Sequence, residues 1–231
     1  MDVAEFDKFA DEYLETHARN IKLSGESPDY FARYKIDEIR RVWTARGRPE
    51  PRVIVDFGAG IGASAPHLRR AFPSADIIGL DVSERSLAIA ERRHSGVARF
   101  LRYDGGAVPV ADGNADLVFS ACVFHHIEAD EHVGLMREIR RVLAPGGALV
   151  IFEHNPVNPV TRYIVATCAF DENAVLIPAG TLRRRCQEAG FGKVEVAYTG
   201  FFPHALAALR PIEPAMKALP VGAQYYVMAH A

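Results

Sequence analysis

The chain has 231 residues, of which 49% are hydrophobic and 24% are charged, and its formal net charge is −2. This balance is typical of a globular protein with one elaborated domain and excludes a disordered chain. The N-terminus lacks the apolar core of a secretory signal, and no apolar run approaches the roughly 20 residues that span a bilayer. The arginine pairs are spread over several predicted helices. We therefore expect a cytoplasmic protein that binds neither membranes nor nucleic acid.

The pattern of elements is that of a parallel sheet with crossover helices. Residues 1–48 predict two helices, at about 6–21 and 30–46. Short apolar runs then alternate with amphipathic stretches. The runs predict strands at 52–58, 75–81, 98–104, 115–121, 148–154, 193–202 and 224–231. The stretches predict helices at 65–72, 84–93, 132–143 and 181–191, the third of which should end at Pro145-Gly146-Gly147.

Two proline-punctuated segments interrupt this alternation, at 156–180 and 203–222. They follow the fifth and sixth predicted strands. Ligands of open α/β sheets bind beyond the carboxyl ends of the strands, so inserted segments at this edge tend to cover the site. We therefore expect both segments to act as lids.

A glycine-rich loop joins the first strand to the first crossover helix. Gly58-Ala59-Gly60-Ile61-Gly62 follows directly on Asp56 and Phe57. Such a loop brings the backbone close to a ligand at a helix N-terminus. Together with Asp81, about 20 residues further on, it also fits the dinucleotide fingerprint. The loop alone therefore does not distinguish a dinucleotide from an adenosyl sulfonium cofactor.

Three successive strands end in a carboxylate. Asp56 would repel a pyrophosphate but would favour a cationic ammonium and sulfonium group. Asp81 can accept hydrogen bonds from both ribose hydroxyls, and Asp104 can accept one from an adenine amine. A lone aspartate at such a position is more often a helix cap or a solvated loop residue. Three of them beside a glycine loop favour a binding site for an adenosyl sulfonium compound.

Four segments resemble the successive motifs of the class I S-adenosylmethionine-dependent methyltransferases. They are VIVDFGAGIGAS, IIGLDVS, YDGGAVPVADGNADLVFSACVFHHI and REIRRVLAPGGALVIFEHN, within residues 50–155. The resemblance implies a single Rossmann-like α/β domain over residues 1–231. Its seven-stranded, mostly parallel sheet would have the order 3-2-1-4-5-7-6 with the last strand antiparallel and helices on both faces. Residues 1–48 would form an N-terminal helical cap, 49–155 the cofactor-binding core, and 156–231 the lid insertions and C-terminal β-hairpin.

The resemblance also implies S-adenosylmethionine as the cofactor and assigns residues to its parts. Asp56, Gly58, Ala59 and Gly60 would lie at the methionine end, Asp81 and Val82 at the ribose, and Asp104 and Gly105 at the adenine. The backbone of Cys122 would touch the cofactor, and Tyr13 would reach over it from the N-terminal helices, although such a ring can equally pack these helices onto the domain.

Histidines gather after the predicted fourth, fifth and sixth strands, as His125, His126, His154 and His204. A histidine is a common general base when the methyl acceptor must lose a proton. His126 is our first catalytic candidate and His125 its competitor, although either ring can instead pack beneath a loop. We predict no metal, because no two ligands have the i, i+4 spacing of a helix site and the three cysteines form no C-x-x-C pair.

The sequence thus predicts a methyltransferase that uses S-adenosylmethionine and acts on a small-molecule acceptor. The acceptor, the methylated atom and the oligomeric state stay open. One alternative is a non-catalytic module that binds the same cofactor. The other is an NAD(P)-linked oxidoreductase, which Asp56 disfavours.

Overall fold

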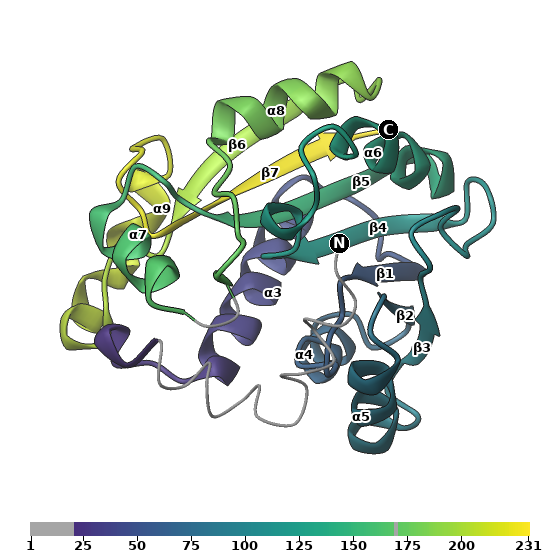
Figure 1. The fold of residues 1–231 in the computed structure, drawn as a ribbon, viewed down its shortest axis with the longest axis horizontal. Helices are drawn as coiled ribbons and strands as arrows, with labels where there is room; N and C mark the ends of the chain where they lie inside the picture. Colours follow the sequence, from purple (N-terminus) through teal and green to yellow (C-terminus); the bar gives the residue numbers. More distant parts are fainter. Residues whose placement is uncertain (1–20, 169–170) are drawn as a thin grey trace.

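The computed structural model describes residues 21–168 and 171–231 of the chain. Seven strands form one sheet in the order β3-β2-β1-β4-β5-β7-β6 (Figure 1). Their bounds are β1 Val53–Phe57, β2 Asp76–Asp81, β3 Arg99–Arg102, β4 Ala115–Ala121, β5 Leu143–His154, β6 Val194–Thr199 and β7 Gln224–His230. Strand β7 is antiparallel to both β5 and β6, and the remaining pairs are parallel. The predicted topology is confirmed.

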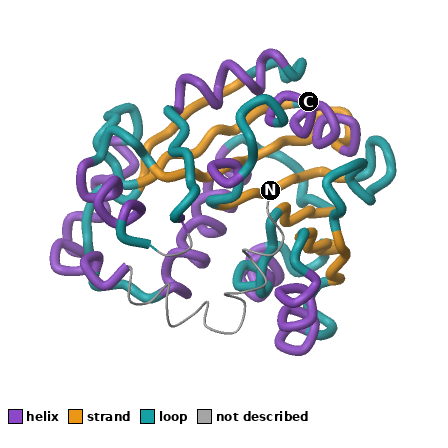
Figure 2. The backbone as a smooth tube through the Cα atoms, viewed as in Figure 1, coloured by secondary structure: helices purple, strands orange, loops and turns teal. Residues whose placement is uncertain are grey.

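Helices cover both faces of the sheet (Figure 2). The α-helices are α3 Pro28–Ala45, α4 Ala65–Ala71, α5 Glu84–His94, α6 His132–Val142, α7 Pro159–Ala166, α8 Ala179–Glu188 and α9 Glu213–Met216. The 3-10 helices are η1 Ile21–Ser24, η2 Phe124–His126 and η4 His204–Ile212. Helices α3 and α4 contribute to one hydrophobic core, and α6 and α8 contribute to the other. The four predicted crossover helices and the second N-terminal helix are confirmed.

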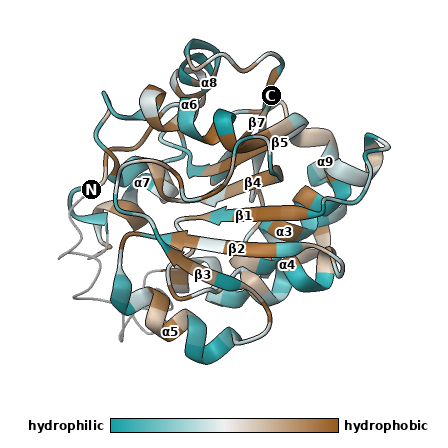
Figure 3. Ribbon diagram, turned by 90° about the vertical axis from the view of Figure 1, so that its right-hand side faces the viewer, coloured by the Kyte–Doolittle hydropathy of each residue, from teal (hydrophilic) through white to brown (hydrophobic). Residues whose placement is uncertain are grey.

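The strands bury side chains on both faces, as their nearly continuous apolar sequences require. In β1, Ile54 packs into the core beneath α3 and α4, while Val55 and Phe57 pack into the core beneath α6 and α8. Figure 3 shows this hydrophobic centre running along β1 and β2 between the helical layers. Helix α3 itself buries Ile36 and Trp43, so this part of the N-terminal region completes the core.

Strand β5 begins earlier than the sequence predicts. Leu143 already pairs with Ala115 of β4, and the register then shifts before Ala148 pairs with Leu117. Gly146, with a φ of 77°, allows the chain to bulge there. Pro145-Gly146-Gly147 is therefore an irregularity within the strand rather than the end of the preceding helix.

The two inserted segments fold into short helices. Residues 156–180 contain α7, whose N-cap Asn158 accepts hydrogen bonds from the backbone of Val160 and Thr161. Residues 203–222 contain η4 and α9. No helix in the described part of the chain is both long and apolar enough to cross a membrane.

Candidate functional site

A cavity of about 1020 Å³ opens at the carboxyl edge of the sheet, where β1, β2, β4 and β5 end. Residues of α3 and α7, the start of α4, and the chain that follows β6 complete its wall. Ligands of open α/β sheets bind at this edge. The glycine loop and residues of both predicted lids therefore line one cavity.

The glycine loop presents bare backbone to this cavity. Gly58, Gly60 and Gly62 all have positive φ values. A Cβ atom on Gly58 would lie 2.2 Å from the side chain of Val123, so only glycine lets the loop pack against the chain that follows β4. The Cβ position of Gly60 has no atom within 4 Å, and the residue lines the cavity.

Asp81, at the end of β2, holds the glycine loop in place. Its Oδ2 accepts a hydrogen bond from the backbone of Gly60 at 2.7 Å, and its Oδ1 accepts one from Ser83 at 2.9 Å. Asp81 and its neighbour Val82 both line the cavity. Asp81, which we predict to bind the ribose, therefore lies at the cavity wall and also fixes the glycine loop beside it.

Asp56 is a buried acid at the wall of the cavity. It is 4% exposed and lines the cavity. Burial, followed by the nearby Asp81 carboxylate, raises the pKa of Asp56 to about 7. Such a carboxyl is suited to a cationic ligand, because an ammonium would stabilise its charged form.

Lys35, on α3, is a buried cation in the same cavity. It is 7% exposed, and its ammonium donates to the backbone oxygen of Phe31 at 3.5 Å. Among the described residues no carboxylate lies within ion-pair distance of it. Sequence reasoning missed Lys35, because a lysine beside the apolar stripe of an amphipathic helix is normally solvated.

Cys122 follows β4 and lines the cavity. Its φ of 58° is the only positive value of a non-glycine residue in the part of the chain that the structure describes. Left-handed backbone at such a residue is strained and often marks a functional position. Its backbone nitrogen donates a hydrogen bond to the carbonyl oxygen of Phe152 at 2.8 Å, and burial raises the pKa of its thiol.

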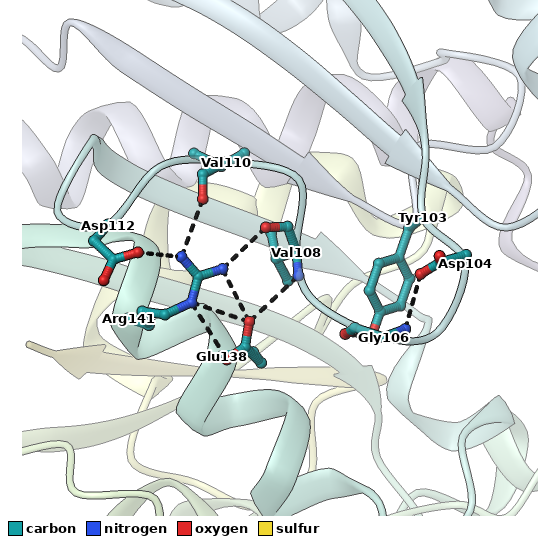
Figure 4. Close-up of polar contacts among 8 residues, drawn as sticks. All are labelled: Tyr103, Asp104, Gly106, Val108, Val110, Asp112, Glu138 and Arg141. Atoms are coloured by element: carbon teal, nitrogen blue, oxygen red, sulfur yellow. Dashed lines mark hydrogen bonds and ion pairs between the residues drawn. The ribbon is translucent and has the colours of Figure 1, made fainter.

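Asp104 and Gly105 lie in an exposed turn after β3 and do not line the cavity, although the neighbouring Tyr103 does. The Oδ1 atom of Asp104 accepts a hydrogen bond from the backbone of Gly106 at 3.0 Å (Figure 4). In the loop that follows this turn, the carbonyl oxygens of Val108 and Val110 accept hydrogen bonds from the guanidinium of Arg141 on α6. The adenine role of Asp104 and Gly105 stays a prediction, and the predicted Tyr13 lies outside the described residues.

His125 lies at the cavity wall, where it is held between two acids. Its Nδ1 lies 2.5 Å from Glu153 Oε2, and its Nε2 lies 3.3 Å from Asp171 Oδ1. Burial alone would lower the pKa of this histidine, but Glu153 and the hydrogen bonds to both acids raise it well above its ordinary value. With 1% exposure, the ring is fixed and His125 is not a free base.

His126 and His154 line the same end of the cavity. Burial and the neighbouring His125 lower the pKa of each ring to about 4. Asp171, which follows α7, lies 3.5 Å from His126 Nε2. The predicted cluster of histidines thus forms in part, because His204 is exposed, pairs with Glu26 and does not line the cavity.

Part of the chain is similar to known proteins. A family model described as a methyltransferase domain matches residues 55–151. A demethylmenaquinone methyltransferase from Thermus thermophilus is 38% identical over 109 residues, which cover 46% of this chain and 49% of the relative. A trans-aconitate 2-methyltransferase from Acidovorax is 41% identical over 105 residues, or 45% of this chain and 38% of the relative.

The fold is similar over nearly its whole length to a solved structure from Thermotoga maritima, a SAM-dependent methyltransferase described as a possible histamine N-methyltransferase. The TM-score is 0.72 at 23% identity, and 98% of each chain is covered. Residues 55–151 thus match a methyltransferase domain, and the fold is that of S-adenosylmethionine-dependent methyltransferases. It spans about half the length of the first curated relative and less of the second.

Proposed function

We propose that the protein transfers a methyl group from S-adenosylmethionine to a small-molecule acceptor. The supporting observation is that a buried acid and a buried cation, Asp56 and Lys35, line one cavity beside the glycine loop without forming an ion pair. The amino-acid end of S-adenosylmethionine carries an ammonium and a carboxylate. These groups complement Asp56 and Lys35, whereas a pyrophosphate would be repelled by Asp56.

The remaining cofactor contacts follow from the positions of the other residues. Gly58, Ala59 and Gly60 present backbone at the methionine end, and Cys122 does so from β4. We assign Asp81 and Val82, which line the cavity, to the ribose. We keep Asp104 and Gly105 as adenine contacts and Tyr13 as a residue that reaches over the cofactor.

When bound, S-adenosylmethionine supplies an electrophilic methyl group on a cationic sulfur. The chain's own contribution is to align the acceptor with that methyl group and to exclude water. We assign the acceptor to the end of the cavity lined by His126 and His154. In this proposal His126 contacts the acceptor as a catalytic residue, and His125 acts mainly as a positioning residue because both of its nitrogens face acids.

Calorimetry with S-adenosylmethionine and with NADH tests the cofactor assignment directly. We expect S-adenosylmethionine to bind and NADH not to bind; the reverse result would overturn the proposal. A panel of hydroxyl, amine and carboxylate acceptors with methyl-labelled cofactor then tests transfer. Binding without transfer to any acceptor would favour the non-catalytic module.

A further inference from the structure

Three potential metal ligands converge at the acceptor end of the cavity. They are one ring nitrogen each of His125 and His126 and a carboxylate oxygen of Asp171, and all three atoms lie within 4.8 Å of one another. The histidines are adjacent on η2, whereas Asp171 follows α7, far along the chain. All three residues line the cavity.

The separations of these atoms are those of ligands around one ion. Asp171 Oδ1 lies 3.3 Å from His125 Nε2 and 3.5 Å from His126 Nε2. Both separations exceed the usual 2.7 to 3.2 Å of an N–H···O hydrogen bond, so the hydrogen bond between His125 and Asp171 is a long one. Ligands at about 2.1 Å from a tetrahedral ion are about 3.4 Å apart, so a cation fits the spacing with little movement.

Glu153 prepares His125 for such a role. The Oε2 atom of Glu153 lies 2.5 Å from His125 Nδ1, and its Oε1 accepts hydrogen bonds from the backbone of Val123 and Phe124. Metal-binding histidines are commonly oriented in this way, by a carboxylate on the nitrogen that does not bind the metal. With a proton held on Nδ1, a cation at Nε2 would take the place of the proton that His125 shares with Asp171.

The charges of the cluster also call for a cation. Glu153 is fully buried and the side chain of Asp171 is 11% exposed, so two carboxylates share a site of low polarity. Buried charges are stable only when they are compensated. In the metal-free chain the imidazole of His125 faces both acids, and a divalent cation at its Nε2 would supply this compensation in the metal-bound chain.

We propose that His125, His126 and Asp171 bind a divalent first-row transition-metal ion, with Glu153 orienting His125. Two histidines and one carboxylate form a common set for Zn²⁺ or Fe²⁺ and leave coordination positions open. Since the ligands line the cavity, these positions face the acceptor. Resting on the proposed function, we infer that the acceptor presents an oxygen, such as a hydroxyl, enol or carboxylate oxygen, to this ion.

This inference reverses our sequence-based expectation of no metal. That expectation rested on the absence of ligands spaced at i and i+4 on one helix. Here two ligands are adjacent on a turn and the third comes from an inserted segment. No local spacing in the sequence indicates such a site.

The test is to titrate the chelator-treated full chain with Co²⁺ alone, without cofactor or acceptor, and to record its visible d–d absorption. We expect an intense, saturable spectrum of low-coordinate Co²⁺ that Zn²⁺ abolishes by competition. His126→Ala and Asp171→Asn should each weaken binding by more than about a hundredfold, and Glu153→Gln by about 10- to 100-fold. His204→Ala removes an exposed histidine outside the cavity and should change nothing.

A spectrum like that of hydrated Co²⁺ would overturn the proposal, as would equal affinity in the wild type, His126→Ala and Asp171→Asn. Circular dichroism and S-adenosylmethionine affinity show whether each variant is folded. Metal binding is measured without methyl transfer, so failure of the metal site and failure of the proposed function are separate results.

Discussion

Asp56 should make both the stability of the ligand-free protein and its cofactor affinity depend on pH. Its pKa is about 7 in the folded chain, compared with an ordinary value of 3.8. Because the folded pKa is raised, protonation of Asp56 stabilises the fold at low pH, and this contribution is lost as the pH rises through 7. Between pH 5 and pH 7 the loss is about 2 kcal/mol.

Cofactor binding should show the opposite trend, because the ammonium of S-adenosylmethionine stabilises the ionised carboxylate. An α-amino group keeps its proton over most of this range, with a pKa of about 7.7 to 8.0. The dissociation constant should therefore fall by about fiftyfold between pH 5 and pH 7, with uptake of the cofactor coupled to release of a proton from Asp56.

The matched variant is Asp56→Asn, which keeps the shape of the side chain but does not titrate. Urea unfolding and calorimetry at pH 5 and pH 7 measure the two effects, and the difference between variant and wild type removes the titration of all other groups. Parallel pH profiles for the two proteins, in either measurement, would refute the reasoning.

Four further substitutions test separate parts of the site. Asp81→Ala should weaken S-adenosylmethionine binding by about 1 to 3 kcal/mol in calorimetry, because the ribose loses an acceptor and Gly60 loses its hydrogen bond. Lys35→Met should weaken it by about 1.5 to 3 kcal/mol without lowering the unfolding temperature, since a buried ammonium without an ion-pair partner is replaced by an apolar chain. Gly58→Ala should lower the unfolding temperature by thermal denaturation, and adding Val123→Ala should restore only part of the loss, because the positive φ remains strained. His126→Ala should lower kcat by at least about 10²-fold with unchanged cofactor affinity and unfolding temperature; a matching loss of unfolding temperature with normal turnover of the folded fraction would instead indicate packing.

The topology could be predicted because its signals are local. Each strand is a short apolar run, each crossover helix has its own periodicity, and the glycine loop lies at a fixed place between them. Strand β5 shows where local reasoning fails. Pro145-Gly146-Gly147 has the composition of a helix terminator, yet pairing of Leu143 with Ala115 draws the segment into the sheet. A tertiary contact decided the outcome there.

The residues that sequence reasoning missed are all defined by contacts between distant segments. Lys35 is notable only because α3 places it at the cavity without a carboxylate. Asp171 is notable only because the segment after α7 returns to η2. Glu153 stood beside His154 in the sequence, but its bond to His125 depends on the pairing of β4 with β5. Spacing along the chain carries none of this information.

The cofactor end of the cavity could be predicted from the sequence better than the acceptor end, and the reason bears on acceptor specificity. The residues that we assign to the cofactor are mainly backbone and acids at the ends of β1 and β2, within the matched residues 55–151, whereas Lys35 lies outside them. The acceptor end also needs Asp171, α7 and the chain after β6, which lie beyond residue 151. Relatives named for acceptors as different as demethylmenaquinone and trans-aconitate align with less than half of this chain. We therefore expect the inserted segments to determine acceptor choice, so exchanging residues 156–180 should alter the acceptor while leaving S-adenosylmethionine affinity close to that of the wild type.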